Sequence, residues 1–271
     1  MHKFSFLPLL ALLAGACSEA APTAPITVRV VKDTEVEWQM LNPLRGDKSP
    51  RAGTLWGDRG APVPCGFLVK FIDGFSSPPH IHPVTYRGVV ISGLVHNDDP
   101  KAEKEWLPPG TFWTQPAGEV HITAAQGATN VAYIEIEKGP YLVKPASDAF
   151  EPPETPIKLA PAEMSWNSTK PRQPAIALLP GNPGNAELTR MMVRLPPKLA
   201  LTMQGDKNEF HVVVITGRVE HEVEGHTAPT TLEPGSYFGS TGPAVHRLRA
   251  TDAETYLYVR AKSTSLALKR R

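Results

Sequence analysis

Three histidines with short, regular spacings could form a metal site. His80 and His82 are separated by one residue, and His121 follows a turn signal at Pro116 and Gly118. Alternate side chains of an extended strand share a face, so His80 and His82 should point the same way. A strand that returns after the turn would bring His121 over that face. Three neutral imidazoles inside a β-barrel would suit iron, zinc, copper or nickel.

Tyr86 lies four positions beyond His82 and therefore falls on the same face if the strand continues. A phenol normally titrates near ~10, but a bound cation could lower that pKa and make Tyr86 a fourth ligand. We favour the other interpretation, in which Tyr86 lines the pocket and provides a hydrogen bond. Tyr86 is thus our candidate catalytic residue, and Glu119 is expected to be a solvated loop carboxylate.

The spacing around these residues resembles the two motifs of the cupin family. In Gly74–Gly93, a glycine precedes five residues, His-x-His, three residues, an acidic position, six residues and a second glycine. In Gly110–His121, a glycine precedes five residues, Pro-x-Gly, two residues and a histidine. Tyr86 stands where most metal cupins have a glutamate ligand. The resemblance implies a jelly-roll barrel that holds one metal through His80, His82 and His121.

The second half of the chain repeats the first. Residues 179–195 parallel residues 55–71, and His246 stands in the place of His121. The other ligand positions have changed, because Gln204, Asp206 and Phe210 replace His80, His82 and Tyr86. Gln204, Asp206 and His246 could bind only a harder, weakly held ion. We therefore expect the second copy to be structural, or to form a small-molecule or dimerisation surface.

These features predict an all-β chain made of two tandem cupin domains, each a jelly-roll β-barrel. The chain has 271 residues, 41% of them hydrophobic, and its 29 prolines favour short strands joined by turns. We place the metal-binding first domain at residues 27–145 and the degenerate second domain at 157–271. The proline-rich residues 146–156 form the expected linker.

The first 26 residues predict export and a lipid anchor. Residues 1–16 read as a signal peptide, with an apolar run too short to span a bilayer. Small residues then precede Cys17, as in a bacterial lipobox, and residues 17–26 resemble a lipoprotein tether. We expect a lipidated Cys17 on the periplasmic side of the cell envelope, with the outer membrane favoured. The remaining Cys65 is expected to be a small buried residue, since it has no disulfide partner.

Charge balance excludes one class of partner. Removing Lys3 with the signal peptide leaves 27 basic and 27 acidic residues, and no basic block interrupts the body of the chain. Nucleic acid is therefore not an expected partner. We expect a small-molecule substrate, membrane contact only through the N-terminal lipid, and a homodimer if sheet edges associate.

The ligand set also suggests a reaction class. Three neutral imidazoles leave a divalent metal with its full charge, which favours an anionic bidentate substrate such as an enolate. The site resembles that of acetylacetone-cleaving cupin dioxygenases, which implies Fe(II) and oxygen chemistry on a small enolisable or dicarbonyl compound. Zn(II), Mn(II) and Ni(II) are the alternative metals. The rival interpretation is a zinc-binding or metal-free envelope protein that binds or senses a small molecule without catalysis.

The lipid anchor gives a first testable prediction. Cys17→Ala removes the acylated side chain, so we expect the variant in the soluble fraction while the wild type stays with membranes. Detergent phase partitioning measures this directly. Recovery of the wild type in the aqueous phase would show that Cys17 carries no lipid.

Overall fold

The computed structural model describes most of the chain: residues 26–170, 172–180, 188–205, 208–225, 227–262 and 266–270. The predicted signal peptide, Cys17 and the tether up to residue 25 lie outside the described residues, as does Asp206. Among the described residues, no helix is long and apolar enough to cross a membrane.

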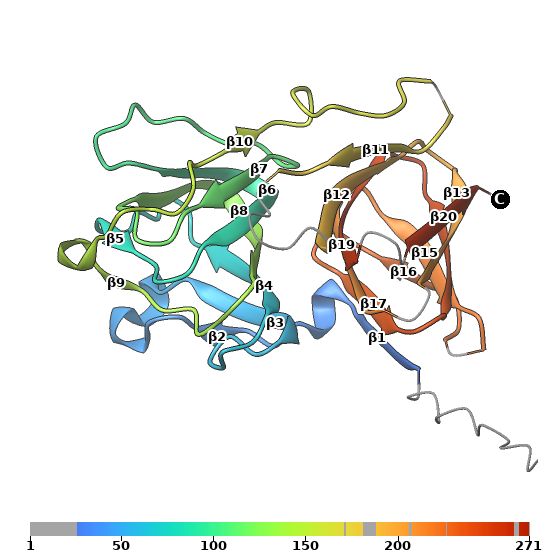
Figure 1. Cartoon of the computed structure of the whole chain (residues 1–271), viewed down its shortest axis with the longest axis horizontal. Coiled ribbons are helices and arrows are strands. Elements are labelled where there is room, and N and C mark those ends of the chain that lie inside the picture. The colour runs from blue at the N-terminus through green and yellow to red at the C-terminus, as the bar shows by residue number, and fades with distance from the viewer. Residues whose placement is uncertain are drawn as a thin grey trace, which may run out of the picture.

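Two β-barrels lie side by side, which confirms the all-β prediction (Figure 1). The first barrel contains a seven-stranded sheet, ordered β10-β7-β6-β8-β4-β3-β2, and a two-stranded sheet, β5-β9. Its strands are β2 (Gln39–Met40), β3 (Arg51–Gly57), β4 (Cys65–Phe71), β5 (His80–Ile81), β6 (Tyr86–Asp98), β7 (Phe112–Gln115), β8 (Ile122–Ile136), β9 (Lys144–Pro145) and β10 (Lys158–Leu159). Three short 3₁₀ helices accompany them: η1 (Asp33–Glu35), η2 (Pro43–Lys48) and η3 (Ala146–Asp148).

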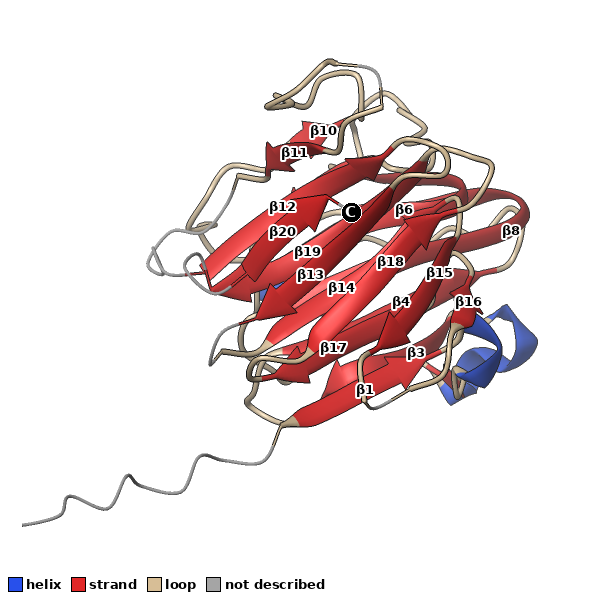
Figure 2. Ribbon diagram, turned by 90° about the vertical axis from the view of Figure 1, so that its right-hand side faces the viewer, coloured by secondary structure: helices blue, strands red, loops and turns tan. Residues whose placement is uncertain are grey.

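The second barrel has two larger sheets. Six strands form the order β1-β17-β14-β19-β12-β11, and five form β16-β15-β18-β13-β20. Figure 2 shows the five-stranded sheet in front of the six-stranded one. The strands are β1 (Thr27–Val31), β11 (Ala175–Leu178), β12 (Leu188–Leu195), β13 (Ala200–Gly205), β14 (Phe210–Thr216), β15 (Val219–Val223), β16 (Thr230–Leu232), β17 (Tyr237–Thr241), β18 (Val245–Ala250), β19 (Thr255–Lys262) and β20 (Leu266–Arg270).

A bent antiparallel pair of strands, β6 and β8, shapes the first barrel. The two strands pair along almost their full length, but the register shifts on both sides of Ser92. Gly93 sits at this bend with a φ of 72°, and a Cβ there would lie 2.0 Å from the Asn130 side chain. Glycine is therefore required at this position. The bend allows one pair of strands to form part of both walls around the site.

Each barrel completes a sheet with a strand from the other sequence range. β1, in the range predicted for the first domain, pairs with β17 of the second barrel. β10, in the range predicted for the second domain, pairs with β7 of the first barrel. Figure 1 shows β1 running beneath the second barrel beside β17. The domain limits themselves stay a prediction, but the exchange ties the two barrels together.

Apolar side chains form three clusters. One fills the first barrel and includes the free, fully buried Cys65, as expected for a small core residue. A second fills the second barrel around Phe210 and Phe238. The third lies between the barrels and joins residues of both, among them Leu68, Val89, Met192 and Val213. Apolar packing therefore joins the two barrels along this face.

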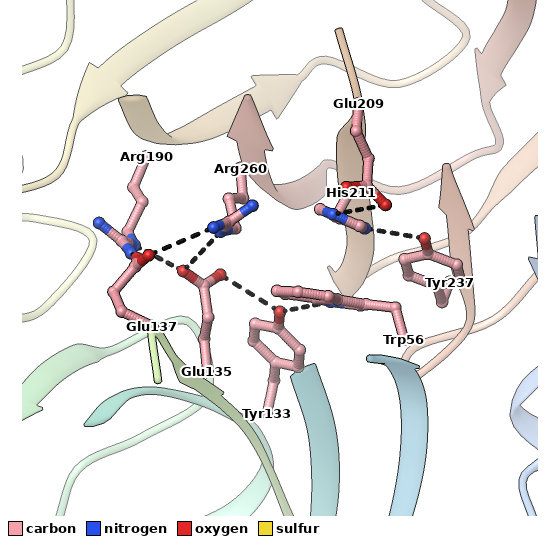
Figure 3. Close-up of polar contacts among 9 residues, drawn as sticks. All are labelled: Trp56, Tyr133, Glu135, Glu137, Arg190, Glu209, His211, Tyr237 and Arg260. Carbon is pink, nitrogen blue, oxygen red and sulfur yellow. Dashed lines mark hydrogen bonds and ion pairs between the residues drawn. The ribbon is translucent and has the colours of Figure 1, made fainter. Parts of the chain in front are cut away.

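A charged cluster crosses this interface (Figure 3). Glu135 on β8 is fully buried, and its Oε1 lies 2.6 Å from Arg190 Nε and 3.2 Å from Arg260 Nε. Burial alone would raise the pKa of the Glu135 carboxyl, but the two guanidinium groups outweigh it and hold that pKa below its usual value. Glu137 also pairs with Arg190. Opposite charges from the two barrels therefore pair across the interface, with Glu135 and Arg190 fully buried.

A ring stack stands beside the charged cluster. Trp56 of the first barrel stacks on His211 of the second, with ring centroids 3.8 Å apart (Figure 3). The indole N–H donates to Tyr133 Oη at 3.1 Å, and that hydroxyl donates to Glu135 Oε2 at 3.3 Å. His211 follows Phe210 along β14, so alternation directs it out of the barrel and into this interface. The aromatic and charged contacts form one network.

Breaking the network should cost much more than breaking a surface ion pair. In Arg190→Ala, Glu135 would keep a buried charge with one partner fewer, so we expect a loss of about 3–5 kcal/mol in the free energy of unfolding. The control is Arg218→Ala, which removes an exposed ion pair with Glu233 and should cost less than about 1 kcal/mol. Urea unfolding measures both. Equal losses would mean that the buried cluster does not hold the barrels together.

Candidate metal centre

The three predicted ligands come together in the first barrel. His80 begins β5, His82 directly follows that strand, and His121 directly precedes β8. Each histidine offers a ring nitrogen, and these nitrogens all lie within 4.8 Å of one another. All three side chains are buried, with 8%, 1% and 1% exposure for His80, His82 and His121. The structure thus confirms that the histidines form one cluster.

Backbone pairing fixes this arrangement. The N–H groups of His80 and His121 each donate to the carbonyl oxygen of the other, both at 3.0 Å. The Gly118 N–H donates to the His82 carbonyl oxygen at 2.9 Å. Gly118 has a φ of 79°, and a Cβ there would lie 2.5 Å from the Phe150 ring. The predicted turn is therefore present, and glycine is needed for it to lie against His82.

Hydrogen bonds set the tautomer of every ligand. The Nδ1 atoms of His80, His82 and His121 lie 2.9, 2.7 and 3.1 Å from the backbone carbonyl oxygens of Pro78, Leu142 and Glu119, respectively. A carbonyl oxygen only accepts, so each Nδ1 must carry the hydrogen and each Nε2 must present a lone pair. His121 Nε2 is buried with no hydrogen-bond partner. This donor set fits a divalent transition metal bound through three Nε2 atoms.

Burial keeps these imidazoles neutral. It lowers the pKa of His80, and it lowers that of His82 well below the usual value, with the neighbouring histidines adding to the effect. Burial and then the charge of His80 lower the pKa of His121 to about 3. At neutral pH a metal would therefore meet lone pairs rather than protons.

The expected strand does not continue from His82 to Tyr86, because β5 ends at Ile81 and Tyr86 begins β6. The Tyr86 ring still lies near His82, with centroids 5.2 Å apart, but its hydroxyl points to a polar chain. The phenol donates to Asn97 Oδ1 at 2.8 Å, and Thr123 Oγ1 donates to the same oxygen at 2.8 Å. Asn97 Nδ2 then donates to Gln115 Oε1 at 2.7 Å. Burial raises the pKa of the Tyr86 phenol, so the group stays protonated. The catalytic role of Tyr86 stays a prediction.

Glu119 is only partly solvated. Its side chain is half-buried and accepts a hydrogen bond from Gln115 Nε2 at 3.2 Å, while its backbone carbonyl oxygen accepts from His121 Nδ1. Burial raises the pKa of the carboxyl. The residue therefore ends the polar chain that begins at Tyr86.

Tyr141 is a site residue that the sequence did not indicate. Its ring stacks on His82 with centroids 4.5 Å apart, and its hydroxyl lies 3.4 Å from His82 Nε2. Burial raises the pKa of this phenol well above its usual value. Tyr141 belongs to neither cupin-like motif. No sequence spacing indicates that the loop carrying it packs against His82. Asn97 was missed for the same reason, whereas Gln115 occupies one of the five unspecified positions of the second motif.

A cavity of about 620 Å³ opens beside the cluster, and of the three histidines His80 lines it. His80 and Tyr86 line it, together with apolar side chains that include Val69, Phe71, Phe75, Trp113, Ile134 and Leu142. Among the described residues that line it, only Arg45 carries a fixed charge, and none is a carboxylate. The site therefore offers three nitrogen ligands beside a largely apolar chamber.

The second barrel arranges its remaining histidine differently. His246 Nδ1 lies 3.0 Å from His221 Nε2, and His246 Nε2 lies 3.1 Å from Ser240 Oγ, all fully buried in the core. Gln204 instead donates to the Pro243 carbonyl oxygen at 3.5 Å. Within the described part of the chain, only the first-barrel histidines form a group able to hold a metal.

Metal content tests this difference between the barrels. His82→Ala removes a ligand from the cluster, so we expect it to abolish tight binding of one metal per chain. His246→Ala is the matched control, because its ring nitrogens already have hydrogen-bond partners, and it should keep the metal. Elemental analysis of purified protein gives the stoichiometry. Two metals per chain, falling to one in His246→Ala, would prove the assignment of the second barrel wrong.

Solved structures of very different proteins share this architecture. A candidate dioxygenase from Nostoc punctiforme matches with a TM-score of 0.64 and 16% identity, over 89% of this chain and 86% of that one. Oxalate decarboxylase from Lactobacillus farciminis, in a formate complex, matches with a TM-score of 0.58 and 9% identity, over 90% and 87%. Procruciferin, an 11S globulin from Brassica napus, gives 0.58 and 9%, over 90% and 86%. Such low identities show the fold alone, and they confirm two tandem cupin barrels.

Comparison at the level of sequence gives the family. No curated protein matches the chain. The family described as a domain of unknown function, DUF4437, matches residues 29–267, which include strands of both barrels. The chain therefore belongs to the DUF4437 family, and it has a cupin fold with a three-histidine site able to hold a metal.

Proposed function

We propose that this protein is a metal-dependent dioxygenase that acts on an enolisable or dicarbonyl compound, with Fe(II) the favoured metal. The observation that carries the proposal is the convergence of three Nε2 lone pairs, each fixed by an Nδ1–H bond to a backbone carbonyl. A divalent metal held by these neutral donors would keep its double positive charge and, as iron, would supply redox chemistry with oxygen. The site then resembles that of acetylacetone-cleaving cupins.

The cavity supports an anionic substrate. A substrate that fills it would displace water from its apolar walls, so a positive centre beside them would be poorly screened and would favour an enolate over its neutral ketone. No described residue that lines the cavity is a carboxylate, so none could act as the carboxylate base that zinc hydrolysis of a neutral substrate would use. This feature favours oxygen chemistry over zinc-dependent hydrolysis.

The two tyrosines would position the substrate. Tyr86 gives its hydrogen to Asn97 and lines the cavity, whereas the Tyr141 hydroxyl lies 3.4 Å from His82 Nε2. A metal bound to that nitrogen would take its lone pair and leave the Tyr141 hydrogen for an oxygen of the substrate. Both phenols stay protonated because burial raises their pKa values. Neither residue would act as a base, so their proposed role is orientation by hydrogen bonds.

We also propose that the enzyme works in the bacterial cell envelope on the periplasmic side, held there by lipid on Cys17. The support is the sequence of the first 26 residues, which is typical of an exported lipoprotein.

Oxygen uptake by the iron-loaded protein tests the proposal. We expect consumption with a panel of β-dicarbonyl compounds, and Tyr86→Phe should slow turnover by roughly tenfold, the effect of about 1.4 kcal/mol in the transition state. Metal content should not change in this variant. Tyr256→Phe is the control, because its hydroxyl contacts Glu254 on the surface.

Two results would contradict the proposal. Iron-loaded protein that consumes no oxygen with any chelating compound would remove the dioxygenase assignment. Purification of the native protein with stoichiometric zinc, or with no metal, would instead favour a binding or sensing role.

A further inference from the structure

We infer that the substrate is an elongated organic acid, with an apolar body that fills the cavity and an anionic group that Arg45 binds. The inference takes from the proposed function only that the cavity beside the histidines is the substrate site. It adds the size and charge of the molecule that this site would select.

The cavity is too large for a small diketone alone. Its volume of about 620 Å³ equals that of roughly 20 water molecules at ~30 Å³ each. It falls within the range of pockets that enclose drug-sized ligands. A five-carbon dicarbonyl compound would leave most of the apolar wall in contact with water. A substrate that fills the space must therefore extend well beyond the chelating group.

The wall selects an apolar body. Phe71, Phe75 and Trp113 contribute aromatic surface, and Val69 and Ile134 contribute aliphatic surface. Each CH₂ of a ligand that is buried against such surface strengthens binding through the hydrophobic effect. The polar groups near the wall are largely engaged within the protein, since Thr123 Oγ1 donates to Asn97 and Ser77 Oγ accepts from the Thr123 N–H. Hydrophobic contact would therefore dominate binding along the length of the cavity.

Arg45 supplies the only fixed charge among the described lining residues. Its guanidinium carbon lies 5.1 Å from the centre of the Phe75 ring, and its Nη2 donates to the Ser76 carbonyl oxygen at 3.5 Å. No ion pair joins Arg45 to a carboxylate within the described part of the chain, whereas Arg51 nearby pairs with Asp47 at 3.8 Å. Stacking on an aromatic face orients a guanidinium while leaving its N–H edge for a carboxylate.

Arg45 and His80 both line the cavity but differ in exposure to solvent. Arg45 lies on the 3₁₀ helix η2 and is half-exposed, while His80 is 8% exposed on β5. The guanidinium is therefore on the solvent side of the cavity, and the histidine is on its buried side. A substrate with its anion at Arg45 and its enolisable carbonyl near the histidines would lay its apolar body against the aromatic and aliphatic wall between them. This geometry points to apolar acids that carry a carbonyl group.

Binding to metal-free protein tests the role of Arg45 without oxygen chemistry. The probes are 8-anilinonaphthalene-1-sulfonate and neutral N-phenyl-1-naphthylamine, which share an aromatic frame and fluoresce when buried. Arg45→Gln should lower the affinity for the anionic probe about tenfold, because it removes a charge-assisted hydrogen bond. The affinity for the neutral probe should not change. Arg51→Gln is the control and should affect neither probe. Circular dichroism would verify that both variants fold.

Competition with unlabelled compounds tests the length of the site. Dodecanoate should displace the anionic probe from the wild type at far lower concentration than butanoate, and more effectively than 1-dodecanol. In Arg45→Gln the acid and the alcohol should become similar. Equal binding of acid and alcohol to the wild type, or equal effects of Arg45→Gln on both probes, would overturn the inference. If the probes and competitors behave as expected but the iron-loaded protein takes up no oxygen, the dioxygenase proposal is wrong and the inference about Arg45 stands.

Discussion

The reciprocal backbone pairing of His80 and His121 is the constraint on which the site depends. Two N–H···O bonds of 3.0 Å hold the start of β5 against the start of β8. Such a pair places both side chains on one face at a fixed separation. The Gly118 turn then binds the His82 carbonyl and fixes the third ligand. The position of each imidazole thus follows from main-chain geometry, and its orientation follows from an Nδ1–H bond to another carbonyl.

Burial gives this geometry its chemistry. The same desolvation that lowers the pKa of His121 to about 3 keeps the phenols of Tyr86 and Tyr141 protonated. Neutral donors, neutral phenols and a wall without carboxylates leave Arg45 as the only fixed charge among the described residues around the cavity. A bound metal would add to that positive charge rather than cancel it. The chamber therefore favours anions, although it is mostly apolar.

Sequence periodicity predicted what depends on local geometry. Strand alternation and the Pro116–Gly118 turn were enough to group the histidines, and the repeat was enough to predict two barrels. Contacts made by distant loops could not be predicted, because no spacing links Tyr141 to His82 or Asn97 to Tyr86. The exchange of β1 and β10 could not be predicted either. Both strands are short, and the sequence does not indicate which sheet edge each one joins. The ion pairs of Glu135 could not be predicted for the same reason, because Arg190 and Arg260 lie in the other half of the chain.

The most direct test of the central claim is ¹⁵N NMR of histidine side chains in the metal-free protein, with assignments from His80, His82 and His121 variants. The structure predicts three Nδ1–H tautomers at neutral pH, each with an unprotonated Nε2. One equivalent of Zn²⁺ should shift all three Nε2 resonances together. Nε2–H tautomers, protonated rings, or a zinc titration that leaves any one of the three unchanged would contradict a preformed three-histidine metal site.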